Sequence, residues 1–573
     1  MRRITGYIVL ILIFGCAGLG VWAQAPNQQG FEIMKNLDIY SNLVKELNQD
    51  YVDEINPGEL TQTGIEAMLE SLDPYTNFIP ESQIEDYKFI TTGQYGGIGS
   101  LIHQQGEYIV ISEPYEGSPS DKTGLKAGDK ILEINGKQAK GKSYEDVSSI
   151  LKGQAGTTVN VLIQRDGAGK PFEKIITREN IKIDNIPYYG IVGKNIGYIK
   201  LTGFTQNAAK ELKQAFLKLK EGTSLKGIII DLRGNGGGLL NEAVDIANIF
   251  VERGQEIVST KGKMADKNHS HLTMSPPVDL NIPVVILVDR SSASASEILA
   301  GSLQDLDRGI VLGQRTFGKG LVQNVVPLSY NAQMKITVAK YYIPSGRCIQ
   351  AIDYEHKKKD GSFGKIPDSL IRAFKTKDGR TVYDGGGINP DVITNPRKFS
   401  NLAMALYGKY LVFDYATKFV REHPSIAPAD TFEITDSIYN GFLEFIKGKD
   451  YSYKTKSERA LEDLKNIALK ENYFDAIKEE YDHLKIRMEK DKQEDMKKYS
   501  DQVRELLRME IVTRYYYQKG KIIAALKHDP ELVDAIATIN DTEKYTGILS
   551  GKFVQPKPEI PVKSEDDDEN PVD

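Results

Sequence analysis

The segment "VVILVDRSSASASEILAGSLQDL", residues 284–306, joins an apolar strand to a helix through a run of serine and alanine. The strand is too apolar to have a solvent-exposed face, so it should lie inside a sheet covered on both sides. Other segments repeat this alternation of buried strand and amphipathic helix, which predicts an α/β core with a mainly parallel sheet. These segments are "IGYIKL" (196–201), "NAAKELKQAFLKLK" (207–220), "GIIIDLR" (227–233) and "LLNEAVDIANIF" (239–250).

The N-terminal segment "MRRITGYIVLILIFGCAGLGVWA", residues 1–23, has the layout of a secretory signal peptide. Two arginines precede an apolar run, and small residues precede a cleavage position after Ala23. An uncleaved anchor in the inner membrane is the alternative. Either form predicts a protein exported to the periplasm or cell envelope.

Composition excludes several kinds of site and partner. Cys16 and Cys348 are the only cysteines, so a cleaved chain would hold one thiol and no intramolecular disulfide. A lone thiol also argues against a cysteine-based metal site, and we expect no cofactor. The net charge of −6 and the lack of a basic patch argue against a nucleic-acid partner.

Changes in residue pattern divide the rest of the chain. Residues 24–90 have helical periodicity, and residues 91–170 have short strands, glycine turns and one helix, as in a compact α+β module. The α/β core occupies residues 171–395. Residues 396–552 predict long amphipathic helices interrupted by the polar stretch "EKDKQED", and residues 553–573 predict a disordered acidic tail. We assign no function to the helices after Pro396.

The serine-rich turn has two interpretations. Ser294, with Glu297 three residues later, fits a capping box that merely starts a helix. The density of small residues also fits a nucleophile, because a substrate carbonyl must approach a hydroxyl on a tight turn. The free amides at the start of the helix would suit a developing oxyanion.

The loop "GQRTFGKG", residues 313–320, matches the opening of a nucleotide-binding P-loop but ends in Gly320 instead of Ser or Thr. The strand-like "LVQNVVPL" follows, where a P-loop requires a helix, so a P-loop ATPase is disfavoured. An exposed lysine is the simplest alternative for Lys319. Its apolar and glycine neighbours also suit a neutral amine that activates Ser294, with Gln323 on the same face of an extended chain.

A second glycine loop, "DLRGNGGGLL", follows the strand at 227–231. It departs from a dinucleotide-binding fingerprint, and a tight turn that needs glycine is the alternative. Loops at the carboxyl ends of parallel strands commonly form sites. Gly237 or Gly238 is therefore a candidate for a second oxyanion amide.

Together these segments resemble the carboxyl-terminal processing peptidases, or tail-specific proteases. In that family the serine precedes the lysine by twenty-five residues, the separation between Ser294 and Lys319. The matching segments are "LDPYTNFI" (72–79), "YGGIG" (95–99), "GLKAGDKILEINGK" (124–137), "DLRGNGGG" (231–238), "SSASASEILAGSLQD" (291–305), "GQRTFGKGLVQ" (313–323), "YYIPSGRCIQ" (341–350) and "GGGINPD" (385–391).

The resemblance implies a crotonase/Clp-protease-like core, a PDZ domain at residues 91–170, and an exported serine endopeptidase that recognises substrate C-termini. It implies Ser294 as nucleophile, Lys319 as base, Gln323 as its support, and the amides of Gly237 and Ala295 as oxyanion donors. The carboxylate-binding loop of the PDZ domain would be Tyr95, Gly96, Gly97, Ile98 and Gly99.

The resemblance also leaves alternatives open. Lys152 and Gly236 stand where the family often has Arg and Pro, respectively. A PDZ-based peptide-binding scaffold without protease activity remains the alternative function. A membrane tether through the N-terminus and a homo-oligomer through the N- or C-terminal helices remain open as well.

Overall fold

The computed structural model describes residues 28–358, 361–396 and 398–552. The predicted signal segment with Cys16 and the predicted acidic tail lie outside the described residues. The described chain divides into two compact units, residues 28–78 with 325–336, and residues 79–324 with 337–552. Within the described ranges, no helix has the length and apolar character needed to cross a membrane.

The first unit contains two helices, α2 (Gln28–Asp50) and α3 (Pro57–Glu70). Asn56 caps α3, because its Oδ1 accepts from the amides of Gly58 and Glu59, and Pro57 occupies the first turn. The predicted helical periodicity is confirmed. The apolar side chains of α2 are nevertheless largely exposed, including those of Phe31 and Met34.

The predicted PDZ region begins the second unit. Its main sheet has the strand order β3-β4-β5-β7-β8, with β6 paired to β5, and a separate ribbon joins β2 to β9. The helix α6 is capped by Ser143, whose Oγ accepts from the amide of Asp146. The elements are η1 (Glu81–Gln83), α4 (Ile84–Thr92), β2 (Gln94–Gly97), β3 (Ser100–Gln105), β4 (Tyr108–Pro114), α5 (Pro119–Lys122), β5 (Lys130–Ile134), β6 (Lys137–Gln138), α6 (Tyr144–Leu151), β7 (Thr158–Gln164), β8 (Phe172–Thr177) and β9 (Glu179–Lys182).

The α/β core contains a six-stranded sheet in the order β10-β11-β12-β15-β16-β23. All strands are parallel except β10, which pairs antiparallel with β11. The sheet elements and their connecting helices are β10 (Tyr188–Val192), β11 (Ile196–Lys200), α7 (Ala208–Glu221), β12 (Gly227–Asp231), α8 (Leu240–Ala247), β15 (Val284–Val288), α9 (Ala295–Asp305), β16 (Ile310–Gly313) and β23 (Val392–Ile393).

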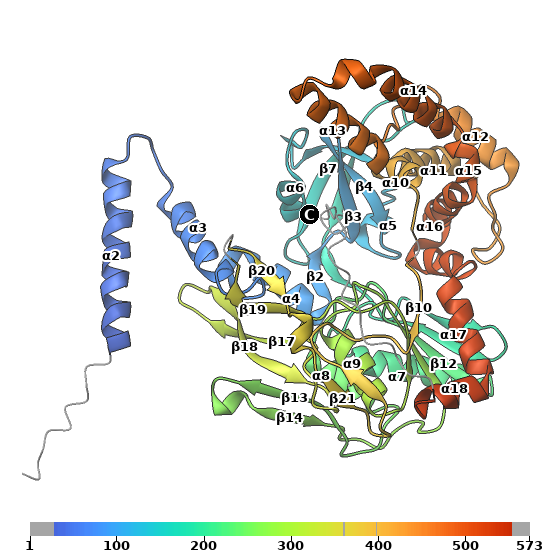
Figure 1. Ribbon diagram of the computed structural model, residues 1–573. Helices are drawn as coiled ribbons and strands as arrows, with labels where there is room; N and C mark the ends of the chain where they lie inside the picture. Colours follow the sequence, from blue (N-terminus) through green and yellow to red (C-terminus); the bar gives the residue numbers. More distant parts are fainter. Residues whose placement is uncertain (1–27, 359–360, 397, 553–573) are drawn as a thin grey trace, which may run out of the picture. The chain divides into compact units, whose positions relative to one another are not determined.

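One face of this sheet, here called the crossover face, is covered by α7, α8 and α9 (Figure 1). The strand order follows the chain order, so successive right-handed crossovers place every connecting helix on the same side. Phe216 of α7, Ile246 of α8 and Ile298 of α9 are buried there with Ile228 and Ile286 of the sheet.

The opposite face, here called the C-terminal face, is covered by α17 (Pro530–Asn540) and α18 (Thr542–Leu549) (Figure 1). Leu532, Ile539 and Ile548 pack on Ile229 and Leu287 of the sheet. The prediction of a sheet covered on both faces is confirmed. The alternating helices do not divide between the faces, however. The second face is covered by α17 and α18, which lie more than 200 residues after α9 in the sequence.

A second sheet and several short ribbons complete the core. The second sheet pairs β14, β13 and β18 in that order, with β17 joined to β18. The elements are β13 (Glu256–Gly262), η2 (Ala265–Lys267), β14 (His269–Leu272), β17 (Leu321–Pro327), β18 (Gln333–Tyr342), β19 (Ile352–Lys357), β20 (Phe363–Lys365), η3 (Asp368–Leu370), β21 (Ala373–Lys375) and β22 (Thr381–Tyr383); β1 (Asn77–Ile79) precedes the PDZ region.

The C-terminal region is helical, as predicted. The interruption predicted over "EKDKQED" (489–495) is confirmed, because α14 ends at Gln493 and the break comes at Glu494, near the end of that stretch. Lysine and glutamate are good helix formers, so the helix continues through most of the stretch before it ends. The helices before α17 are α10 (Asn401–Gly408), α11 (Leu411–Glu422), α12 (Asp436–Ile446), α13 (Lys456–Lys470), α14 (Phe474–Gln493), α15 (Asp495–Lys498) and α16 (Ser500–Leu526).

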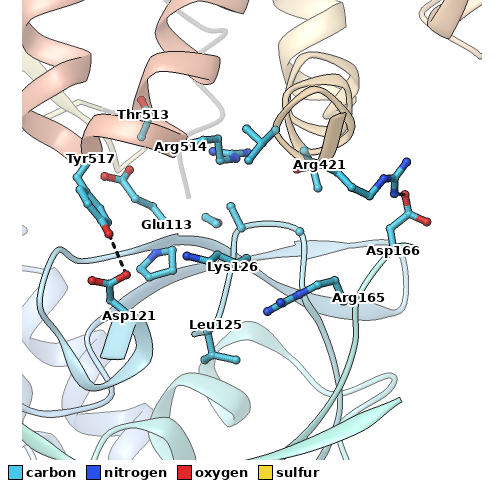
Figure 2. A pocket seen from close by; sticks show the side chains of 16 residues that line it. Glu113, Asp121, Leu125, Lys126, Arg165, Asp166, Arg421, Thr513, Arg514 and Tyr517 are labelled. Atoms are coloured by element: carbon cyan, nitrogen blue, oxygen red, sulfur yellow. Dashed lines mark hydrogen bonds and ion pairs between the residues drawn. The ribbon is translucent and has the colours of Figure 1, made fainter. Parts of the chain in front are cut away.

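The PDZ region packs against α11 and α16 around a cavity of about 240 Å³. Figure 2 shows Tyr517 of α16 directed at Asp121 of α5, to which its hydroxyl donates at 2.9 Å. Tyr517 has φ 52° and ψ −158°, so it kinks α16 at this contact. Arg421 of α11 bridges to Asp166 across the same interface, at an exposed position where ion pairs stabilise little.

Candidate active site

Ser294 lies where the chain turns from β15 into α9. Its φ of 56° and ψ of −115° are unusual for a residue with a side chain and store backbone strain. Such strain persists only where surrounding contacts enforce it, and it is common at reactive residues. Ser294 is half-buried, at the start of an otherwise buried helix.

The two neighbouring serines are structural. Ser292 and Ser296 are fully buried, and their hydroxyls donate to the carbonyls of Leu232 at 2.8 Å and Asn235 at 2.9 Å. Both hydroxyls thus hold the Ser294 turn against the glycine loop after β12. Burial and hydrogen bonding distinguish them from Ser294, the serine selected by its separation from Lys319.

Glu297 joins the Ser294 turn to the Lys319 loop. Its Oε2 accepts from the amides of Ser294 at 2.8 Å and Lys319 at 2.9 Å, and its Oε1 accepts from the hydroxyl of Thr316 at 2.5 Å and the amide of Gly318 at 2.8 Å. The side chain is fully buried. Burial raises the pKa of Glu297 to about 7, although the four hydrogen bonds favour the ionised form.

Lys319 is half-buried in the irregular segment between β16 and β17. The hydroxyl of Tyr341 donates to the carbonyl of Lys319 at 2.6 Å and lies 3.2 Å from the carbonyl of Ser294. Tyr341 and Glu297 therefore both bridge the two backbones. A strand follows the loop, where a P-loop would place a helix, and this disagrees with the ATPase alternative.

Gln323 lies in β17, four residues after Lys319. Its Nε2 donates to the hydroxyl of Thr337 at 3.2 Å. This bond fixes the amide plane, and within the described part of the chain Oε1 accepts no hydrogen bond. The oxygen is the atom that a lysine ammonium or amine would bind.

The two predicted oxyanion donors, the amides of Ala295 and Gly237, lie beside Ser294 but differ in their hydrogen bonding. The Ala295 amide, in the first turn of α9, donates to no acceptor among residues 28–358, 361–396 and 398–552. The Gly237 amide donates to Asn235 Oδ1 at 2.9 Å, so in this conformation an oxyanion would have to replace that oxygen. Gly237 has φ 98°, and a Cβ there would lie 2.9 Å from the Ala295 nitrogen. The close approach thus requires glycine.

Three family models match this chain. Residues 195–357 match peptidase family S41, residues 110–165 match a PDZ domain, and residues 402–539 match "Probable PDZ-protease, C-terminal helical domain". The first match contains Ser294, Lys319 and Gln323.

The chain is 35% identical over 347 residues to the carboxy-terminal-processing protease of Bartonella bacilliformis, covering 59% of this chain and 79% of the relative. The chain belongs to the carboxy-terminal-processing proteases. It is also 36% identical over 318 residues to a probable CtpA-like serine protease of Staphylococcus aureus, covering 55% of this chain and 62% of the relative.

A solved structure of a photosystem II D1 C-terminal processing protease is 27% identical, with a TM-score of 0.34. The match covers 62% of this chain and 92% of that chain. Membership of the carboxy-terminal-processing proteases makes this chain a serine peptidase with a PDZ domain and a C-terminal helical domain.

In this carboxy-terminal-processing protease, the predicted carboxylate loop is partly a strand. Gly96 and Gly97 belong to β2 and pair with β9, as does Tyr95. Within the described ranges, the amides of Ile98 and Gly99 donate to no acceptor, and Gly99 has φ 74°. Two adjacent free amides with a left-handed residue are suited to a carboxylate.

The outer edge of β3 faces α6, and β3 is the first strand of its sheet. A peptide added at this edge would have its C-terminus near Ile98 and Gly99, which is the strand-addition mode of PDZ recognition. Lys152, at the end of α6, forms an exposed ion pair with Asp86 of α4 at 2.7 Å. At this exposure the pair contributes little stability.

Sequence reasoning missed several buried polar residues around the site. Glu297 was identified only as a helix cap, and Tyr341 was not considered. Asp231, at the end of β12, accepts from Tyr198 and contacts Lys200 and Arg233. Although burial opposes ionisation, Lys200 and Arg233 hold the pKa of Asp231 well below its usual range. The acidic and basic residues that flank the glycine loop were the sequence signal from which this buried cluster could have been predicted.

Proposed function

We propose that this peptidase uses Ser294 as nucleophile and Lys319 as its general base. The observation that carries the proposal is the shared carboxylate of Glu297, which fastens the backbones of both residues side by side. Ser294 attacks the substrate carbonyl while neutral Lys319 takes the hydroxyl proton, which it then returns to the leaving amine. Gln323 orients the lysine, the amides of Ala295 and Gly237 stabilise the oxyanion, and water releases the acyl group.

The test is cleavage of an unstructured peptide by the wild type, Ser294→Ala and Lys319→Ala. Both substitutions should reduce kcat by at least about a thousandfold, because neither hydroxyl nor base can be replaced by water. Ser291→Ala, at an exposed position in the same turn, is the matched control and should keep wild-type activity. Full activity of Ser294→Ala would rule out the proposal, and peptide binding without cleavage by the wild type would favour the scaffold alternative.

We further propose that the PDZ domain engages the free C-terminus of a protein substrate and that cleavage occurs upstream. The free amides of Ile98 and Gly99 and the open edge of β3 support this role. A peptide ending in a carboxylate should have a KM at least about tenfold lower than the same peptide ending in an amide. Equal KM values for the two peptides would contradict it.

We propose export to the periplasm or cell envelope, supported by the arginines and apolar run of residues 1–23. Mass spectrometry of the secreted or membrane-bound protein should find Gln24 at the N-terminus. An intact N-terminus in the membrane fraction would instead indicate an anchor, and an intact chain in the cytoplasm would exclude export.

We also propose self-association through α2, whose exposed Phe31, Met34 and Leu43 support a contact between copies of the chain. Light scattering should give a multiple of the chain mass for the wild type, and the chain mass for Phe31→Asp/Met34→Asp. A wild type that remains monomeric at high concentration would exclude this assembly.

A further inference from the structure

The glycine loop after β12 begins with Arg233, two residues after the buried strand ends at Asp231. Its backbone carbonyl accepts from Lys200 Nζ at 2.7 Å, and the next amide, that of Gly234, donates to the Asp289 carboxylate at 3.0 Å. Asn235 then donates through Nδ2 to the carbonyl of Leu201 at 2.8 Å. The loop that carries Gly237 is thus anchored at its first three residues, and Phe204 pairs with Gly237 and Gly238 at its other end.

The guanidinium of Arg233 is held by two carboxylates from different parts of the chain. Asp231 accepts from Nε at 3.0 Å and Nη2 at 2.7 Å. Asp529 accepts from Nη2 at 2.6 Å and Nη1 at 3.1 Å. The two acids clamp the planar group from both edges, an arrangement for which arginine is better suited than lysine.

A third carboxylate completes this cluster. Glu531 Oε2 accepts from Arg233 Nη1 at 2.7 Å, and its Oε1 accepts from the hydroxyl of Thr394 at 2.5 Å. Gln314, the first residue of the Lys319 loop after β16, lies within 3.5 Å of the same oxygen. Glu531 therefore contacts the chain just beyond three parallel strands: β12, β16 and β23.

These contacts are not ordinary surface ion pairs. Asp529 and Glu531 are 9% and 8% exposed, and the Arg233 side chain is 18% exposed. A buried charge left without its partner is costly, so each member constrains the others. Both acids stand at the start of α17: Asp529 is the N-cap, accepting from the amides of Glu531 and Leu532.

From these contacts we propose that Asp529 and Glu531 are positioning residues of the peptidase, which hold the 233–238 loop in its catalytic conformation through Arg233. This inference rests on the proposed Ser-Lys mechanism. Neither acid reaches the reacting atoms. The C-terminal helical segment would thus complete the oxyanion site that the peptidase core begins.

The test uses the full-length chain with Asp529→Asn, Glu531→Gln and both together. Asparagine caps helices as well as aspartate does, and glutamine can still accept from Thr394, so the substitutions remove charge at Arg233 while preserving the start of α17. Asp534→Asn, on an exposed position of the same helix, is the matched control.

Peptide cleavage by the double variant should show kcat lower by about 10- to 100-fold and KM within about twofold of the Asp534→Asn control. The pH midpoint of activity should stay unchanged, since Lys319 is not touched. In an Arg233→Lys background, Asp529→Asn should lower kcat little further, because the acid acts through the guanidinium. If the double variant does not fold, the kcat and KM of Asp529→Asn alone, measured against Asp534→Asn, test the proposal.

Amide hydrogen exchange provides an independent readout, because it does not depend on activity. Exchange in residues 233–238 should be faster in the double variant than in the control, with the rest of the core protected. Faster exchange in the double variant, combined with a wild type that cleaves nothing, would support the positioning role while refuting the proposed function. Unchanged exchange together with control-level kcat would overturn the positioning role.

Discussion

The two faces of the central sheet are covered by helices of different origin, and each cover carries acids that fasten a loop of the candidate active site. On the crossover face, Glu297 in the first turn of α9 holds Ser294 and Lys319. On the C-terminal face, Asp529 and Glu531 at the start of α17 hold Arg233 beside the glycine loop. Helix N-termini favour negative charge, which suits both arrangements.

Glu297 differs from Asp231, the acid at the end of β12 that also binds Arg233, in the groups that it faces. Glu297 accepts only from uncharged donors, and burial raises its pKa to about 7. Asp231, beside Lys200 and Arg233, has a pKa below its usual range despite burial. The difference teaches that a buried carboxylate bound only by neutral donors changes its protonation near neutral pH. A buried carboxylate bound by cations stays ionised there.

Removal of the C-terminal cover should have the largest effect. A chain ending at residue 528 lacks Leu532, Ile539 and Ile548, each of which contributes about 1.5–3 kcal/mol by burial. That loss is comparable to a typical domain's whole stability. Circular dichroism and limited proteolysis should show an unfolded or partly folded core, whereas a chain ending at residue 552 should melt like the full chain. Cooperative melting of the shorter chain would contradict this prediction, because it would show that the core folds without the cover on the C-terminal face.

Glu297→Ala should have the next largest effect, on the crossover face. It leaves four donors without their acceptor, at about 1–3 kcal/mol for each group that water cannot reach. Urea denaturation should show a loss of several kcal/mol, and kcat should fall at least about 100-fold because Ser294 and Lys319 lose their common anchor. A stable and active Glu297→Ala would show that Tyr341 alone holds the loops together.

The dependence of stability on pH should distinguish Glu297 from Asp231. The pKa of Glu297 is about 7 when folded, against 4.5 when exposed. Its contribution to the free energy of unfolding is therefore complete below pH 4.5 and lost as the pH rises to about 7. The stability of the wild type relative to Glu297→Gln should fall over this interval, while relative activity rises as the carboxylate ionises. Urea titrations at several pH values measure the trend, and a flat difference would contradict it.

Asp231 should behave in the opposite sense. Its lowered pKa means that its contribution to stability is present above the ordinary aspartate range and is lost only on strong acidification. Between pH 5 and 8 the difference in stability between the wild type and Asp231→Asn should therefore stay constant. A slope in this neutral range would indicate that the cations do not protect the carboxylate.

Paired conservative truncations should give the smallest effects. Ile298→Val on the crossover face and Ile539→Val on the C-terminal face should each cost about 0.5–1.5 kcal/mol. If both covers belong to one cooperative unit, the two variants should share the wild-type dependence of free energy on urea. A changed slope for Ile539→Val alone would show that α17 unfolds separately.

The elements of the core and the Ser294 turn were predictable because their signals are local. Five apolar residues at 284–288 specify a buried strand, and the small residues after them specify a tight turn into α9. The partner of α17 was not predictable. An amphipathic pattern shows which side of a helix is apolar, but it does not show what that side contacts.

The same limit applies to the acids around the site. The spacing of Ser294 and Glu297 predicts a helix cap, yet the second loop bound by Glu297 comes from residues 316–319 and is visible only in the folded chain. Arg233 follows a strand whose position was predicted. Its partners at Asp529 and Glu531 are almost 300 residues away, beyond any sequence periodicity.

The late position of α17 and α18 has a consequence for biosynthesis. A ribosome makes the Ser294 turn and the Lys319 loop more than 200 residues before it makes Asp529. Throughout that interval the C-terminal face has no cover, and Arg233 lacks two of its three acids. If Ser294 and Lys319 form the proposed dyad, a nascent chain carries both residues before the segment that holds Arg233 has been made, so the synthesis of α17 would decide when cleavage can begin.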